Sequence, residues 1–404
     1  MRKWIKLLAC SPVVVLFAGC QQGSMRMSNA ELREKANRLA QKYILVDTHL
    51  DTPWRLAKKM EDISIRAEGG CFDYPRARAG GLDAVFMAAY VPPEYEQDGG
   101  AKALAEERIE MIKGLAKKHP EKFIMAKSTS DVSAQFNDER VSLLIAIENG
   151  SALEGDIENV KHFYDLGTRY ITLVHAENNA ICDSSYTRYR KWNGLSPVGK
   201  EVVAEMNRLG MMVDVSHVSD ETFYQVIELS KAPVVATHSS CRHFTPDMER
   251  NMSDEMIQHL AKKGGLIQIN FGAMFLDAEI SKKYLKRWDI VKAHVKEHDL
   301  DDAAKEEFKK QYDRDHPIEN GDISMVVAHI DHVVKLVGAE YVGLGSDFDG
   351  VGNALPQGLE DVSCYPNLIY ELLKKGYSDS DIEKICSGNI LRVWTEIERI
   401  GREN

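Results

Sequence analysis

The sequence predicts a single α/β domain folded as a (β/α)8 TIM barrel. Three observations support this fold class. Eight short apolar runs have the length of buried strands, helical patterns separate most of these runs, and polar residues stand where several runs end. An open doubly wound sheet is the alternative, but no GxGxxG motif follows an early strand.

Composition and charge narrow the class of protein. The chain has 404 residues, of which 44% are hydrophobic and 28% charged, so it can form a sizeable core and shows no signature of disorder. Its formal net charge is −11, and no block of Lys and Arg accompanies aromatic residues. A nucleic-acid partner is therefore not expected.

Residues 1–20 have the pattern of a secretory signal peptide. Basic residues precede an apolar run over 7–17, which is too short to span a bilayer as a stable helix. The run leads into Leu-Phe-Ala-Gly-Cys, which resembles a bacterial lipobox with Cys20 as the lipidated residue, although Phe17 stands where Leu is usual. We expect an exported, cell-envelope lipoprotein held at the membrane by an N-terminal lipid. An ordinary cleaved signal is the alternative.

The cysteines indicate neither a disulfide framework nor a thiolate metal site. Seven Cys are present, and five remain once Cys10 and Cys20 are assigned to the leader and the lipid. These five are odd in number, have no repeated spacing and form no CxxC pair. One disulfide remains compatible with an exported protein.

A polar tether over 21–28 precedes a single barrel domain expected over 29–404. An amphipathic helix over 30–43 leads into the first strand. All eight predicted strands are apolar enough to be buried on both faces. They lie at 44–47, 84–91, 141–148, 170–175, 211–217, 234–238, 265–270 and 341–347.

Helical patterns fill most of the intervals between these strands. Several end on a glycine, such as Gly167 and Gly210, and Ser219 and Ser253 are candidate N-caps with an acid in the following turn. A long, charged and largely helical insertion at about 273–321 departs from the repeat, and it could form a flap over the barrel mouth or a subunit contact. The predicted helices lie at 158–166, 198–209, 220–229, 254–263 and 323–337.

The end of the first strand carries the first chemical signal. His49 and Asp51 are two residues apart, and Pro53 prevents regular strand pairing beyond them. In an extended segment, residues at i and i+2 project to the same side, so both side chains can bind one ion. An imidazole and a carboxylate suit zinc or a related divalent metal, but two ligands do not make a site.

Other predicted strands also end in a His, Asp or Glu residue that could bind a metal. Each alone is more often a hydrogen-bonded structural histidine or a helix cap than a ligand. A barrel, however, brings the C-terminal ends of its strands to one rim, where seven such groups without a metal would leave polar atoms unsatisfied. The set is His49, Asp51, Glu148, His175, His217, His238 and Asp347.

This set is larger than one zinc ion requires. His49, Asp51, His217 and His238, with Glu148 as a bridge, suit two Zn2+ ions roughly 3.5–4 Å apart. A water shared by the ions would have a pKa near neutrality and would supply hydroxide, the nucleophile of a metal-dependent hydrolase. Asp347 could orient that water and carry its proton to a leaving amine, and His175 could donate to the developing oxyanion.

At these residues the sequence resembles the membrane (renal-type) dipeptidases, which are binuclear zinc peptidases on a barrel fold. The resemblance covers 44–394, and its motifs together are highly specific. It implies a dipeptide substrate, tolerance of a D-residue at the carboxyl side, and a homodimer. The motifs that carry it are Asp47-Thr48-His49-Leu50-Asp51, Ile147-Glu148-Asn149-Gly150, Thr172-Leu173-Val174-His175, Asp214-Val215-Ser216-His217, Thr237-His238-Ser239-Ser240 and Gly345-Ser346-Asp347-Phe348-Asp349-Gly350.

The resemblance also assigns a substrate-binding arginine. Arg250, before Asn251, resembles the family residue that holds the terminal carboxylate of the substrate, and the planar guanidinium can bind a carboxylate bidentately. Without the resemblance, a solvated arginine ahead of a helix would be the simpler interpretation. Arg242 and Arg188 are nearby alternatives, although both match the family pattern less well.

We therefore expect a zinc-dependent dipeptidase that acts outside the cytoplasm. The nearest alternative is another binuclear-metal amidohydrolase, acting on a cyclic amide, lactone or phosphoester. That class commonly uses a carboxylated Lys as the bridge, whereas Glu148 occupies the bridging position here. A peptide-binding or metal-binding lipoprotein without catalysis is the alternative from another class. The side-chain preference at either substrate position is not predicted.

Overall fold

A computed structural model describes residue 1 and residues 27–403. The predicted signal peptide with Cys20, and most of the predicted tether, lie outside the described residues. The five cysteines of the described part are all free, so no disulfide forms among them. Within the same residues, no helix combines the length and the apolar character needed to cross a bilayer.

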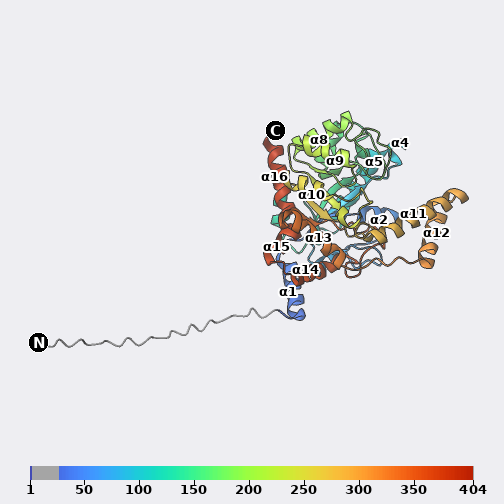
Figure 1. Cartoon of the computed structure of the whole chain (residues 1–404). Helices are drawn as coiled ribbons and strands as arrows, with labels where there is room; N and C mark the ends of the chain where they lie inside the picture. The colour runs from blue at the N-terminus through green and yellow to red at the C-terminus, as the bar shows by residue number, and fades with distance from the viewer. Residues whose placement is uncertain (2–26, 404) are drawn as a thin grey trace.

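The strands form a barrel in which every neighbouring pair is parallel, as predicted (Figure 1). The order around the barrel is β1-β2-β4-β5-β6-β7-β8-β9. The first and last strands meet through two backbone hydrogen bonds. The amide of Asp347 donates to the carbonyl of His49 (3.1 Å), and the amide of Asp51 donates to the carbonyl of Phe348 (2.9 Å). The strands are β1 (Val46–Leu50), β2 (Ala84–Tyr90), β3 (Phe123–Met125), β4 (Val141–Glu148), β5 (Thr168–Thr172), β6 (Met212–Asp214), β7 (Val235–Ser239), β8 (Leu266–Ile269) and β9 (Val342–Leu344).

One strand was missed, and three predicted strands were too long. β3 pairs only with the first residues of β4, and its three residues are too few to show a period. β5, β6 and β9 end three residues before the polar groups His175, His217 and Asp347, which were predicted as their last residues. These side chains stand in the loops that follow, and positive φ angles of 71° at His217 and 62° at Asp347 show that the backbone has left the extended conformation.

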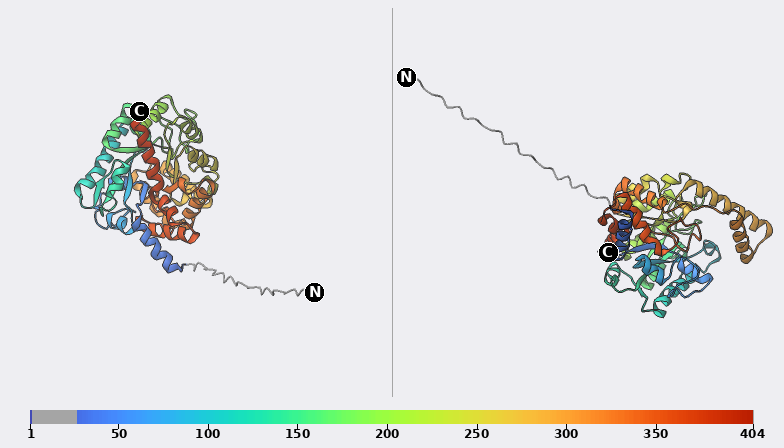
Figure 2. Two further views of the ribbon diagram at one scale, coloured as in Figure 1. Left: turned by 90° about the vertical axis from the view of Figure 1, so that its left-hand side faces the viewer. Right: turned by 90° about the horizontal axis from the view of Figure 1, so that it is seen from below.

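The helices follow their strands on the outside of the barrel (Figures 1 and 2). The predicted N-caps are confirmed, since the side chains of Ser219 and Ser253 accept from the amides of Thr222 and Met256. The helices before the insertion are α1 (Asn29–Lys42), α2 (Thr52–Lys58), α3 (Tyr74–Gly80), α4 (Tyr95–Asp98), α5 (Ala101–Lys118), α6 (Thr129–Gln135), α7 (Glu158–Leu166), α8 (Pro197–Leu209), α9 (Asp220–Leu229) and α10 (Asp254–Lys262). Those after it are α13 (Ser324–Val337), α14 (Tyr365–Lys375), α15 (Asp379–Glu383) and α16 (Asn389–Glu403).

Helix α16 closes the N-terminal end of the barrel. It lies across that end of the molecule, as the left view of Figure 2 shows. Its fully buried Trp394 packs in one cluster with Phe86 of β2 and Tyr170 of β5, and Phe86 lies 5.6 Å from the Trp394 ring. Apolar side chains thus fill this end. The polar side chains follow the C-terminal ends of the parallel strands, so they meet at the opposite end.

The insertion after β8 forms two helices, α11 (Ala278–His298) and α12 (Asp302–Asp315), which we call the arm. The arm projects from the barrel in Figures 1 and 2. Its helices are held together by the ion pair of Arg287 with Asp313 and by stacking of His294 on Phe308, whose ring centroids lie 3.7 Å apart.

Candidate metal centre

His49, at the end of β1, is completely buried, and its hydrogen bonds define its tautomer. Its Nδ1 lies 2.8 Å from the hydroxyl of Tyr170, and that hydroxyl donates to the carbonyl of Thr48 (2.8 Å). The hydroxyl must therefore accept from Nδ1–H, and in the neutral imidazole Nε2 then has a lone pair. This Nε2 is buried and has no hydrogen-bond partner, as expected of a metal ligand.

His238, on β7, is oriented in the same way, by a hydrogen bond of its Nδ1 to a neighbouring hydroxyl. The hydroxyl of Thr237 donates to the carboxylate of Asp214 (2.7 Å), so it accepts from Nδ1–H of His238 at 2.9 Å. The free Nε2 of His238 then lies only 2.8 Å from Nε2 of His217. Two such imidazoles with converging nitrogens fit a shared cation.

Glu148, the last residue of β4, stands at the middle of the cluster. Its Oε1 lies 3.1 Å from Nε2 of His217 and 3.3 Å from Nε2 of His238. Its Oε2 lies 3.7 Å from Nε2 of His49, so the two oxygens of one carboxylate face different histidines. This is the arrangement that a bridging carboxylate needs.

Two aspartates complete the rim beside β1 and β9. Oδ1 of Asp51 is buried without a hydrogen-bond partner, and its Oδ2 lies 3.4 Å from Nε2 of His49. The carboxylate of Asp347 accepts a hydrogen bond from the side-chain amide of Asn270 (2.7 Å). A Cβ at Gly350 would lie within 2.2 Å of both carboxylates, so this position requires glycine.

Burial and the neighbouring charges set the protonation of the centre. Burial and the charge of Arg250 lower the pKa of His217 well below its usual value, and burial and His49 lower the pKa of His238 to about 4. Both imidazoles are therefore neutral, which is the form that binds a metal. Burial would raise the pKa of Glu148, but the surrounding histidines outweigh burial and hold that pKa well below its usual range.

The residues present fit a metal centre. The orphaned atoms of His49 and Asp51 are acceptors that cations satisfy, and the donor set of imidazoles and carboxylates suits zinc or a similar ion. Three groups have ligand atoms within 4.8 Å of one another: His49, Glu148 and His238; Glu148, His175 and His217; and His49, Asp51 and Asp347. All seven residues predicted from the strand ends thus come together.

His175 lies closer to the metal-binding groups than its predicted role requires. Its Nε2 is 3.7 Å from Oε1 of Glu148, and its ring lies 4.4 Å from that of His217. Nδ1 faces the hydroxyl of Tyr90 at 3.5 Å. Burial lowers the pKa of His175, so this imidazole is neutral and can either donate to a substrate or face a cation.

Arg250 is buried beside the centre, and one of its donors is free. Its Nη1 donates to the hydroxyl of Ser239 (2.7 Å) and its Nη2 to the carbonyl of His238 (2.7 Å), whereas Nε is buried without a partner. Tyr186 lines the cavity described below, and burial raises the pKa of its hydroxyl, which the charge of Arg250 lowers. Arg242 instead forms a bidentate pair with Asp220, and Arg188 is exposed, so neither alternative matches this position.

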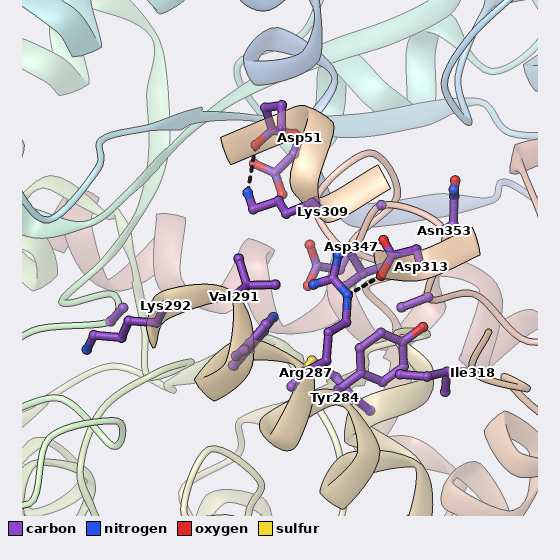
Figure 3. Close-up of a pocket in the computed structure, with 18 of the residues that line it drawn as sticks. Asp51, Tyr284, Arg287, Val291, Lys292, Lys309, Asp313, Ile318, Asp347 and Asn353 are labelled. Atoms are coloured by element: carbon purple, nitrogen blue, oxygen red, sulfur yellow. Dashed lines mark hydrogen bonds and ion pairs between the residues drawn. The ribbon is translucent and has the colours of Figure 1, made fainter. Parts of the chain in front are cut away.

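A cavity of about 1180 Å3 opens above the centre. Its floor contains Asp51, Glu148, His217 and Asp347. Its aromatic wall was not predicted, because in a sequence an uncharged aromatic residue looks like part of the core. Figure 3 shows that Tyr284, Arg287 and Val291 of the arm line the same cavity as Asp51 and Asp347. The wall near the floor is formed by Trp54, Tyr90, Tyr186 and Phe275.

Comparison with known proteins shows the family of the chain. The family model described as membrane dipeptidase (peptidase family M19) matches residues 33–404. Dipeptidase 3 of Mus musculus is 31% identical over 382 residues, which cover 92% of this chain and 68% of the relative.

Two solved structures have the same fold. The probable dipeptidase PvdM of Pseudomonas aeruginosa superposes with a TM-score of 0.80 at 26% identity, covering 92% of this chain and 99% of the other. The metallopeptidase dipeptidase AC, of family M19, has a TM-score of 0.72 at 25% identity, covering 88% of this chain and 98% of the other. The chain therefore belongs to the membrane dipeptidases of peptidase family M19, and it is a metallo-dipeptidase.

Proposed function

We propose that this dipeptidase uses two Zn2+ ions bridged by Glu148 to hydrolyse the peptide bond of dipeptides. The observation that carries the proposal is the position of Glu148, whose Oε2 faces His49 while its Oε1 faces His217 and His238. His49 and Asp51 would hold one ion, and His217 and His238 the other. When bound, the ions would polarise the scissile carbonyl and supply a nucleophilic hydroxide near neutral pH.

The remaining residues position the substrate and move its protons. Asp347, held by Asn270, faces the same space as Asp51 and is placed to accept a proton and pass it to the leaving amine. His175 has a ring nitrogen free to donate to the oxygen of the scissile carbonyl as negative charge develops. Arg250 would bind the free carboxylate of the dipeptide through its unpartnered Nε–H.

The proposal extends to substrate stereochemistry. The resemblance to the family supports tolerance of a D-residue at the carboxyl side. The cavity volume of about 1180 Å3 exceeds the roughly 300–1,000 Å3 of usual ligand pockets, so it leaves space for either configuration.

Metal analysis combined with a dipeptide panel tests the proposal. The purified enzyme should contain two equivalents of zinc and hydrolyse L,L-dipeptides together with substrates that end in D-Ala. Glu148→Ala should abolish turnover and release metal, whereas Glu177→Ala, which removes an exposed carboxylate after β5, should do neither. Full activity in zinc-free Glu148→Ala enzyme would refute the assignment.

We also propose that the enzyme is a homodimeric, exported lipoprotein anchored through Cys20. The sequence pattern at 16–20 supports the anchor, and the family resemblance supports the dimer. Metabolic labelling with palmitate should mark the wild type but not Cys20→Ala, and light scattering should give twice the chain mass. Labelling of both proteins, or a monomer mass, would contradict the respective part.

A further inference from the structure

A second cluster of metal-binding side chains lies outside the catalytic cavity. It contains His243 of the short 3-10 helix η2 (Arg242–Phe244), Asp254 at the start of α10, and His332 on α13. One ligand atom from each residue lies within 4.8 Å of the other two. The three residues come from three separate elements, so the fold, and not local sequence, brings them together.

Hydrogen bonding within this cluster leaves one member without a partner. Nε2 of His332 lies 2.7 Å from Oδ1 of Asp254, which accounts for two of the residues. The ring of His243 stacks on that of His332, with centroids 4.4 Å apart and planes at 20°, yet its nitrogens form no hydrogen bond within the described part of the chain. The nitrogens of His243 are therefore available to a cation that the carboxylate of Asp254 also contacts.

The predicted catalytic centre offers a comparison within the same molecule. There, His49 and His238 are also stacked, with ring centroids 3.7 Å apart and planes at 26°. Their nitrogens also share a carboxylate, that of Glu148. The cluster at His243 thus repeats the local arrangement of the predicted ligands with one carboxylate and two imidazoles.

We propose that His243, Asp254 and His332 form an additional binding site for a divalent transition-metal ion, with Zn2+ as the best match. Two imidazole nitrogens and one carboxylate oxygen are a usual zinc donor set, and partial exposure leaves the fourth position to water. The side chains of His332 and Asp254 are 18% and 45% exposed, so an ion can reach them from solvent. This site is independent of the proposed catalytic assignment.

The location of the site connects it to the substrate-binding loop. The segment between β7 and α10 carries Arg250, and His243 lies near its beginning while Asp254 immediately follows its end. An ion bound here would join both ends of this loop to α13. It would supplement the existing link in which the amide of Cys241 donates to Nδ1 of His329 (3.0 Å), one turn before His332.

Calorimetric titration of the full-length, metal-loaded enzyme with Zn2+ tests the site. The wild type should bind one equivalent beyond its catalytic metal, and its melting temperature should rise with added Zn2+. His243→Ala should lose this equivalent and the temperature shift. Because His243 is exposed, its replacement should leave the fold intact, which circular dichroism can verify.

Two further variants separate the site from general surface binding. Asp254→Asn should also lose the additional equivalent, because it keeps the size of the side chain but removes the charge. His259→Ala, which removes another exposed histidine on α10, should retain it. Equal Zn2+ uptake by the wild type and His243→Ala, or loss in His259→Ala, would overturn the proposal.

Discussion

Arg242 positions Arg250, and its replacement should selectively weaken recognition of the substrate carboxylate. Its Nε donates to the carbonyl of Asn251 (2.7 Å) and its Nη2 to the carbonyl of Glu249 (2.9 Å), so it holds the chain on both sides of Arg250. The same guanidinium pairs bidentately with Asp220 of α9, at 2.7 and 2.6 Å. Arg242→Ala removes all of these contacts at once.

The expected magnitude follows from these hydrogen bonds. A hydrogen bond to a charged group contributes about 1.5–3 kcal/mol. Glu249 keeps a second anchor, because its carboxylate also accepts from the amide of Asp220 (3.0 Å), and the side chain of Asn251 still bonds to the carbonyl of Phe275 (2.7 Å). We therefore expect Arg250 to be displaced at a cost equal to one such hydrogen bond of Arg242. That cost of about 1.5 kcal/mol in substrate binding corresponds to roughly a tenfold increase in KM.

Steady-state kinetics on a dipeptide and on its C-terminal amide provide the assay. Arg242→Ala should raise KM for the dipeptide about tenfold with little change in kcat, and it should affect the amide much less, since the amide has no carboxylate for Arg250. Arg242→Lys should recover part of the loss. Equal losses on both substrates would show a general structural effect and refute the positioning role.

Three further perturbations test the centre and its support. Tyr170→Phe removes the acceptor for Nδ1–H of His49, so the affinity for metal should fall about 10- to 100-fold in a chelator competition; unchanged affinity would exclude this role. Dialysis against a chelator should abolish turnover and lower the melting temperature, and zinc should restore both, while turnover that persists without metal would contradict the metal assignment. Trp394→Ala should lower the free energy of unfolding by about 3–5 kcal/mol in urea denaturation, because it empties the closed end of the barrel; a loss below about 1 kcal/mol would argue against that packing role.

The rim residues could be predicted because a barrel makes strand ends converge. His49 and His238 are 189 positions apart in the chain, yet their rings stack, and the prediction required only that both follow buried strands. The place of Glu148 among the histidines followed from the same rule, because it is the last residue of β4. Errors of three residues at the ends of β5, β6 and β9 did not matter, because the loops turn inward over the barrel.

The supporting residues could not be predicted in the same way. Tyr170 and Thr237 orient the histidines through side-chain hydroxyls, and in the sequence they look like ordinary strand residues. Trp54 and Tyr186 of the cavity wall carry no charge pattern, and only the folded chain brings them near Glu148. The position of the arm over the cavity likewise depends on tertiary contacts that a helical pattern does not specify.

Anomalous diffraction at the zinc edge, from crystals of the enzyme, shows whether two ions bind to the two oxygens of Glu148. We expect two peaks, each about 2.0–2.2 Å from an oxygen of Glu148, one beside Nε2 of His49 and the other beside Nε2 of His217. A zinc-loaded, active enzyme with no peak within bonding distance of Glu148 would contradict this expectation.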